Sequence, residues 1–334
     1  MPWTESTDLK IALLNTENLF LLFDQPPTLE HTKLDEIQWQ KLSTSIYPNK
    51  NLAKLKELAR TFNDMDADII LLCEVGGSES LKHFNELFLE NKYSTALMEG
   101  NSDRNIDVGF LVRKNLPFYF DLSTNKHRLI NFNYDSERFL KTPPEHKLSR
   151  DCAELKLFQR ESDKPFLNIL LTHLKSRLDP EKKDPNGFAR RQAELKTVVD
   201  IANEVQKRNP NVPLILAGDF NGNASLRSTD EEFKYLYEHT QLQDVLELGG
   251  LADDRRATFA QVRAGLRSEG RQIDFCFLTP KAAQYLDKSS ATVYRYKDSY
   301  GFDLDLPTTL EQKLELPSDH YPIFFKLHNV PFKA

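Results

Sequence analysis

The sequence has few cysteines, and they are not arranged as a metal site or a disulfide framework requires. Cys73, Cys152 and Cys276 each lie in or beside an apolar run, and the chain contains no CxxC pair. Cysteine-based zinc sites and disulfide scaffolds need several cysteines at set spacings. We therefore expect three buried, reduced thiols.

Long hydrophobic runs and an excess of basic charge are also lacking. No apolar stretch approaches the roughly 20 residues that cross a bilayer as a helix. The first residues, MPWTESTDLK, have neither the basic nor the apolar region of a signal peptide. The 44 Lys and Arg residues against 50 Asp and Glu residues give a net charge of −6. We expect a cytoplasmic protein with no membrane span and no overall basic field, although a locally basic groove is compatible with this composition.

The chain shows no Ser/Gly/Pro linker, low-complexity tract or internal repeat, so we predict a single domain over residues 1–334. Spacing of apolar residues at i, i+3 and i+4 predicts helices over 49–65, 187–208 and 230–245. Short apolar runs predict strands over 9–20, 67–77, 108–115, 152–158, 165–176, 271–280 and 318–327, and the stretch 212–223 begins as a buried strand and ends in polar residues. Runs that are apolar on both faces indicate sheets covered on each side.

Two long, Pro-bearing connections, 24–48 and 286–317, interrupt this alternation. Connections of that length usually have a function or are disordered. They are either walls of a substrate cleft or disordered surface, and the sequence alone does not decide between these alternatives.

Polar side chains gather at the ends of the predicted strands. Taken singly, such a residue is usually a turn former or a helix cap, and the stretch GDFNGN on its own could be a hairpin turn. Their joint placement favours chemistry instead. The residues are Asn15, Glu17, Glu74, His173, Asp219, Asn221, Asp274, Asp319 and His320.

These residue types suit attack on a phosphodiester. The reaction needs a cation, a base and donors for the developing negative charge. Oxygen ligands with no cysteine nearby favour Mg²⁺ or Mn²⁺ over Zn²⁺. Asp219 and Asn221 would point the same way if the extended geometry continued past the strand, so that one handles a proton and the other donates to the phosphate.

The ordered series NTEN, CEV, THLKS, GDFNGN, IDFCFL and SDHYP, from about residue 9 to 327, resembles the endonuclease/exonuclease/phosphatase superfamily. The pair GDFN and SDH is its most specific part. The resemblance implies an α+β fold, a four-layer αββα sandwich of two packed, mostly antiparallel β-sheets flanked by helices. It also implies a phosphodiester hydrolase that depends on Mg²⁺ or Mn²⁺.

The resemblance further implies individual roles. Glu74 would be the main metal ligand, with Asp319 and with Asn15 or Glu17 close by. Asn15 is also a candidate for binding substrate. Asp219 would orient or deprotonate the attacking water.

Three other positions would act on the phosphate. Asn221 would donate a hydrogen bond to it. His320, oriented by Asp274, would act as general base or bind the phosphate, since a carboxylate partner fixes the tautomer of an imidazole and stabilises its charged form. His173 would contact the phosphate or assist the leaving oxygen.

Two further stretches match positions of relatives. Arg150, followed by Asp151, is expected to contact the phosphate or border the site, with a surface ion pair as an equal alternative. In GFARRQAELK, Arg191 or Gln192 is expected to support the loop after His173 and not to touch substrate.

The substrate is the least determined property. Stretch 175–191 holds six basic residues against three acids, and stretch 255–271 holds five against Glu269. If both border the cleft, they would contact the phosphates of DNA or RNA; ordinary solvated surface is the alternative. We predict a nuclease. A phosphatase or phosphodiesterase for a lipid headgroup or sugar phosphate is the alternative, and a catalytically inactive binding module ranks third because the expected ligands are all present. Oligomeric state stays open.

Overall fold

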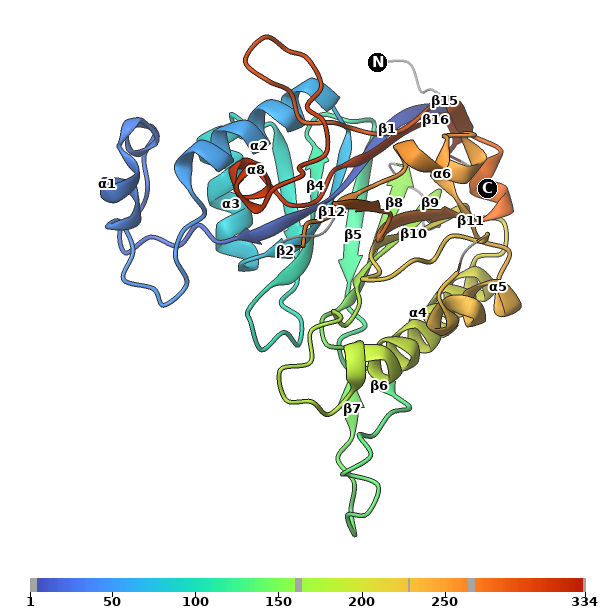
Figure 1. The fold of residues 1–334 in the computed structure, drawn as a ribbon. Coiled ribbons are helices and arrows are strands. Elements are labelled where there is room, and N and C mark those ends of the chain that lie inside the picture. Colours follow the sequence, from blue (N-terminus) through green and yellow to red (C-terminus); the bar gives the residue numbers. More distant parts are fainter. Residues whose placement is uncertain (1–4, 160–163, 228, 264–267, 333–334) are drawn as a thin grey trace.

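The computed structural model describes residues 5–159, 164–227, 229–263 and 268–332. Two six-stranded sheets stack face to face, and helices cover the outer side of each (Figure 1). This arrangement confirms the predicted α+β sandwich. Within the described ranges, no helix combines the length and apolar character that crossing a membrane requires.

The first sheet has β1 near its centre. In spatial order it consists of β15 (Leu286–Val293), β16 (Ile323–Pro331), β1 (Ser6–Leu19), β2 (Ile69–Val75), β4 (Asp107–Arg113) and β3 (Tyr93–Leu97). All neighbouring strands are antiparallel except β1 and β2.

The second sheet is built in the same way around β10. Its order is β11 (Gln243–Asp244), β14 (Asp274–Leu278), β10 (Leu214–Asp219), β9 (Leu167–His173), β8 (Cys152–Gln159) and β5 (Phe118–Ser123). Here β9 and β10 form the parallel pair. The expectation of mostly antiparallel sheets is therefore confirmed.

The strands are apolar on both faces because each face has its own cover. In β10, Ile215 and Ala217 pack between the sheets, whereas Leu214 and Leu216 face the helices. The helices α4 (Phe188–Arg208) and α5 (Lys234–His239) cover the second sheet, and α2 (Leu52–Met65) and α3 (Gly77–Phe88) cover the first. Each fully buried Leu or Ile contributes roughly 1.5–3 kcal/mol to folding. The three cysteines are buried and free.

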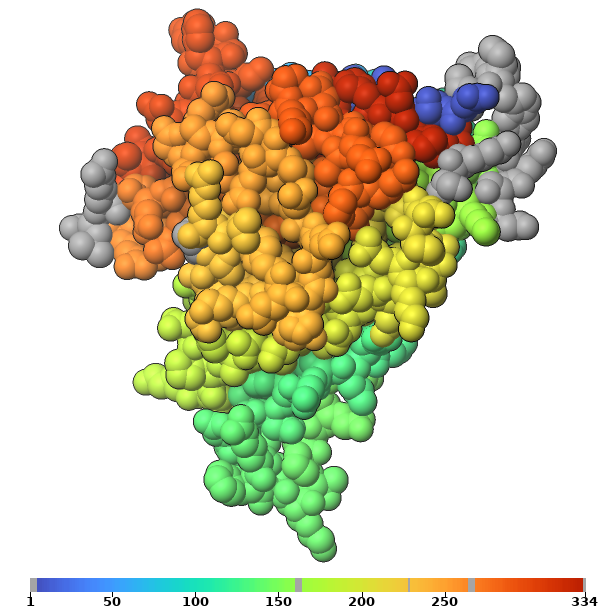
Figure 2. Space-filling model, turned by 90° about the vertical axis from the view of Figure 1, so that its right-hand side faces the viewer, coloured from blue at the N-terminus to red at the C-terminus, as the bar shows by residue number. Residues whose placement is uncertain are grey.

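A small hairpin of β6 (Leu129–Ile130) and β7 (His146–Lys147) projects from the second sheet. Figure 2 shows it as a protrusion at the lower end of the molecule. Its connection carries Phe139, which is 91% exposed. A second small pair, β12 (Phe259–Gln261) and β13 (Glu269–Arg271), lies beside the loop that precedes β16.

The predicted helix over 230–245 is wrong in its last part. A 3-10 turn, η3 (Glu231–Phe233), leads into α5, which ends at His239. Thr240 then turns the chain, because its hydroxyl donates to the Leu236 carbonyl and accepts from the amide of Leu242. The chain continues into β11 and the short helix α6 (Val245–Leu248).

The two long connections contain more structure than expected. Connection 24–48 holds η1 (Leu29–Lys33) and α1 (Glu36–Gln40), which stand at the left in Figure 1. Buried Trp39 anchors it by donating to the Lys50 carbonyl (3.0 Å). Range 286–317 is not one connection, since it begins with β15 and ends in α8 (Leu310–Glu315).

Candidate active site

The polar strand ends meet at one edge because of the strand directions. In the parallel pair β9–β10, His173 lies opposite Asp219, and the antiparallel neighbour β14 places Asp274 opposite Asp219 as well. In the first sheet, parallel β1 and β2 end together, and the loop before antiparallel β16 arrives at the same edge. The side-chain Nδ2 of Asn15 donates to Asp219 Oδ2 (3.0 Å), and this hydrogen bond joins the two sheets.

Four side chains form what we call the Asp–His cluster: His173, Asp219, Asp274 and His320. Asp274 Oδ2 lies 2.8 Å from His320 Nδ1, and Asp219 Oδ2 lies 3.9 Å from His320 Nε2. His173 Nε2 lies 3.5 Å from the same oxygen of Asp219. All four are almost completely buried. Thr258 holds the start of β14 by accepting from the amide of Asp274.

Burial and mutual charge set the proton affinities in this cluster. Burial alone would lower the pKa of His320, but the carboxylates around it, that of Asp274 first, outweigh burial and raise this pKa well above its usual value. Burial and the charge of Asp274 raise the pKa of Asp219 to about 7. Burial lowers the pKa of His173 well below its usual value. At neutral pH the cluster thus pairs a charged and a neutral imidazole with a carboxyl group that can gain or lose a proton.

Three carboxylates form a second group beside it, the carboxylate cluster: Glu17, Glu74 and Asp319. Their side chains are 14–27% exposed, more open than the Asp–His cluster. Glu74 Oε2 accepts the amide of Asn18 (3.1 Å), and Glu74 Oε1 lies 4.0 Å from His173 Nε2. Glu17, Asn18 and Glu74 all have positive φ values, of 50°, 57° and 62°. For glutamate this backbone is strained, and strain of this kind concentrates at functional sites.

Lysines pair with two members of the carboxylate cluster, Glu17 and Asp319. Lys54 and Lys50 lie 3.2 and 3.5 Å from Glu17 Oε2, and Lys313 lies 3.2 Å from Asp319 Oδ2. Burial lowers the pKa of Lys50 to about 8. Burial opposes ionisation of Asp319, but His320 and Lys313 outweigh it and lower its pKa. These lysines were not among the predicted site residues: Lys50 and Lys54 belong to the predicted helix 49–65, whose periodic pattern marks its buried face and not its lysines, and Lys313 lies in the connection 286–317.

Both clusters offer possible metal ligands. Asp219, Asp274 and His320 place one ligand atom each within 4.8 Å of one another. His320 Nδ1 is already paired with Asp274 Oδ2. A proton shared by these two side chains therefore suits the Asp–His cluster without a metal ion. The carboxylate cluster offers hard oxygen donors that are partly open to water, and this donor set fits Mg²⁺ or Mn²⁺. Asn15 fits a ligand role less well, since its Oδ1 accepts from the amide of Glu17 and its Nδ2 is bound to Asp219.

The sequence matches a family model described as endonuclease/exonuclease/phosphatase over residues 10–249. The chain belongs to this family. None of the curated proteins matches it.

Solved structures of the same family agree with the fold. C. elegans TDP2 shares 17% identity, with 96% of this chain and 75% of that one covered and a TM-score of 0.53. The human Nocturnin catalytic domain with bound sulfate shares 16%, with coverage of 96% and 94% and a TM-score of 0.55. D. rerio TDP2 complexed with a single-strand DNA product shares 14%, with coverage of 97% and 100% and a TM-score of 0.55. At these identities the likeness establishes the fold alone.

In this family member, Asn221 does not continue the strand geometry expected for it. β10 ends at Asp219, and Asn221 has a φ of 52°. Its amide nitrogen donates to Asp219 Oδ1 (2.8 Å), and its side chain donates to the Leu174 carbonyl (3.0 Å). One residue before Asp219, Gly218 allows β10 to approach β9 closely, because an added Cβ would lie 1.8 Å from the Thr172 carbonyl oxygen.

Arg150 and Asp151 do not form the surface ion pair that was one alternative. Both are buried, and Asp151 accepts from the Thr124 hydroxyl and the Asn125 amide. Among the described residues, Arg150 Nε has no hydrogen-bond partner. Arg150 lines a cavity of about 370 Å³ together with Lys175. A buried guanidinium with a free donor beside a cavity is suited to bind an anion.

Arg191 has the supporting position expected for it. It is buried, pairs with Glu232 (2.6 Å) and donates to the carbonyls of Lys175 and Asn186. It therefore holds the segment that follows His173. Glu194, which was not predicted, assists by accepting from the Lys175 amide (2.7 Å).

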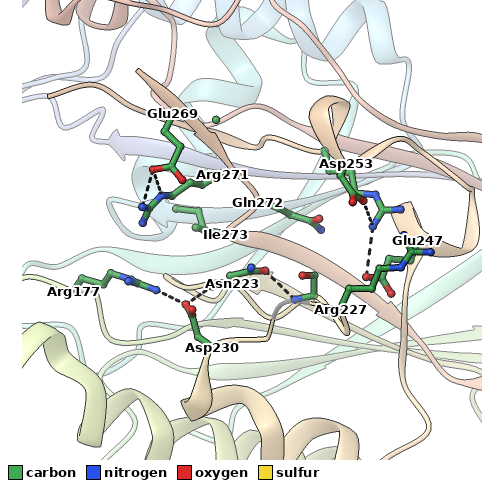
Figure 3. Close-up of a pocket in the computed structure, with 13 residues that line it drawn as sticks. Arg177, Asn223, Arg227, Asp230, Glu247, Asp253, Glu269, Arg271, Gln272 and Ile273 are labelled. Carbon is green, nitrogen blue, oxygen red and sulfur yellow. Dashed lines mark hydrogen bonds and ion pairs between the residues drawn. The ribbon is translucent and has the colours of Figure 1, made fainter. Parts of the chain in front are cut away.

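The second basic stretch, 255–271, is partly neutralised in its described residues. It borders a cavity of about 440 Å³ that Asn223 and Ile273 also line, and residues 264–267 lie outside the described part. In Figure 3, Arg271 pairs with Glu269. Arg256 forms ion pairs with Glu247 and Asp253. Two of the basic residues in this stretch are thus compensated locally.

Proposed function

We propose that the chain is a divalent-metal-dependent nuclease that cleaves DNA or RNA by in-line attack of an activated water. One observation supports this most directly. The Asp–His cluster meets the carboxylate cluster at His173, whose Nε2 lies 3.5 Å from Asp219 and 4.0 Å from Glu74. Proton-handling groups and ion-binding groups are therefore adjacent, as hydrolysis of a phosphodiester requires.

In the proposed mechanism, Asp219 holds the water and takes its proton as the water attacks phosphorus. Asn15 keeps Asp219 in place. Asn221 hydrogen-bonds the scissile phosphate, and the charged imidazole of His320, paired with Asp274, stabilises its oxygens. His173 lies on the side of Glu74, where the leaving oxygen develops charge. An ion held by Glu74, Asp319 and Glu17 would supply positive charge at the phosphate.

Nucleic acid is favoured as substrate because cations border the site on one side. Arg150 and Lys175 line the neighbouring cavity, and contacts to phosphates need no reading of sequence. D. rerio TDP2, which has a similar fold, has been solved in complex with a single-strand DNA product. A lipid headgroup or sugar phosphate remains the alternative substrate class. The sequence contains every side chain for which a catalytic role is proposed, which argues against an inactive binding module.

A substrate panel tests the proposal. Plasmid DNA, RNA, bis-p-nitrophenyl phosphate and a set of phospholipids are compared with Mg²⁺ and with EDTA. We expect metal-dependent cleavage of at least one nucleic acid. Rapid turnover of a small ester or a phospholipid with no cleavage of nucleic acid would contradict the proposed substrate.

A further inference from the structure

A third cavity, of about 450 Å³, opens beside the carboxylate cluster, and the proposed function does not use it. It shares Glu17 and Asn18 with the catalytic edge. Its other walls include Phe20 from the end of β1 and Tyr47 from the connection 24–48. The connection that the sequence left unexplained thus ends next to the candidate active site.

The apolar part of this cavity is a stacked pair of rings. The rings of Phe20 and Tyr47 lie parallel, with centroids 4.7 Å apart and an interplanar angle of 8°. Phe20 is buried against Gly76, where a Cβ would lie 2.2 Å from its ring. The Tyr47 hydroxyl accepts from the Asn105 side chain (2.8 Å), which fixes the orientation of the ring.

Tyr47 is therefore the outer ring of a supported stack. It is half-buried, and Phe20 is the one ring stacked on it in the part of the chain that the structure describes. A flat, oriented ring at the wall of a cavity presents a surface on which another planar group can stack.

The remainder of the cavity wall is basic. Lys50, Lys54 and Arg104 face a single acid, Glu17. Arg104 donates to the Asn18 side chain (2.7 Å), and the backbone of Asn18 donates to Glu74. Arg104 also lines the cavity of Arg150. The cations therefore continue from the stacked rings, past the carboxylate cluster, to Arg150.

We propose that Tyr47 is the stacking platform for an unpaired nucleobase adjacent to the scissile phosphate, and that the strand continues over Arg104 to Arg150. This inference rests on the proposed nuclease function and narrows its substrate to single-stranded nucleic acid or an unpaired strand end. Aromatic rings alternating with cations bind single strands without sequence preference. In a duplex both faces of each internal base are already stacked, so the platform selects against it.

The test compares two oligonucleotides of equal length, one with bases and one in which the residues flanking the cleavage site are abasic. Stacking contributes roughly 1–3 kcal/mol per base. Tyr47→Ala is therefore expected to lower kcat/KM for the base-bearing strand about 5- to 150-fold more than for the abasic strand, mainly through KM. Tyr47→Phe keeps the ring and should restore most of the difference.

Tyr119→Ala is the matched control. Tyr119 also stacks on a partner, Phe158, with centroids 5.4 Å apart and an interplanar angle of 12°. It pairs with the far end of β8, whereas Cys152, at the near end of β8, pairs with Thr172 beside the site. Tyr119→Ala should leave kcat/KM unchanged for both oligonucleotides. Thermal unfolding of both alanine variants checks that they fold. An equal loss on both strands, or no loss, overturns the stacking platform while leaving the nuclease intact. A wild-type protein that hydrolyses only bis-p-nitrophenyl phosphate overturns both proposals.

Discussion

The two clusters at the catalytic edge are chemically similar but differ in their contact with water. Side chains of the Asp–His cluster are 1–7% exposed, and those of the carboxylate cluster 14–27%. In the first, Asp274 is paired with His320, and burial together with the charge of Asp274 raises the pKa of Asp219 to about 7. In the second, Glu17 and Asp319 face lysines, and burial opposes ionisation of Asp319 but His320 and Lys313 outweigh it and lower its pKa. We therefore propose that burial prepares the Asp–His cluster for exchanging protons, and that contact with water prepares the carboxylate cluster for holding a hydrated ion.

The largest loss of activity is expected from substitutions in the buried Asp–His cluster. Asp219→Ala and His320→Ala each remove a side chain proposed to act on the proton or the phosphate, and they should lower the rate of phosphodiester hydrolysis by at least roughly 10²- to 10⁴-fold. Rates are measured at saturating metal, and cooperative unfolding confirms the fold. His328→Ala, at an exposed histidine of β16, should be neutral. Substantial turnover by either site variant would contradict these roles.

A buried carboxylate outside the site shows what burial does by itself. Burial raises the pKa of Asp244 to about 7 from its usual 3.8. The folded state therefore prefers the protonated form, and stability from this group is fully present below pH 3.8 and lost as pH rises to about 7. Relative to Asp244→Asn, the wild type should lose at most about 4 kcal/mol over that range.

Urea unfolding of wild type and variant at several pH values measures this difference. Asp254→Asn, at an exposed acid in the same region, should run parallel to the wild type at every pH. A constant gap between wild type and Asp244→Asn would show that burial leaves the pKa of Asp244 unchanged.

Changes in the carboxylate cluster should lower the activity less, and added metal should reverse the loss. EDTA should abolish activity, and Mg²⁺ or Mn²⁺ should restore it. Glu74→Gln should raise the metal concentration for half-maximal activity by roughly 10- to 100-fold, as titration of activity against Mg²⁺ measures. Glu79→Gln, at an exposed acid on α3, is the control. Activity that is indifferent to chelation would exclude the metal from the mechanism.

Much of this arrangement could be predicted from the sequence. Apolar runs ending in a polar residue located β2, β9 and β10, because the buried middle of a strand is apolar and polar residues gather where the strand reaches the edge of the sheet. Strands apolar on both faces indicated covered sheets. The left-handed backbone at Glu74 and Asn221 could not be predicted, since no apolar period marks it. Nor could the positions of Lys50 and Lys313, because tertiary packing brings the start of the predicted helix 49–65 and the connection 286–317 to the site.

The hydrogen bond from Asn15 to Asp219 crosses from one sheet to the other. The packed side chains between the sheets tolerate small sliding movements far better than a directional bond of 3.0 Å does. A slight shear of the sandwich would therefore misalign the reacting groups while most of the apolar contacts survive. The proposed activity therefore depends on the alignment of the two sheets. On heating, we expect the rate of hydrolysis to fall at a lower temperature than the one at which the secondary structure is lost.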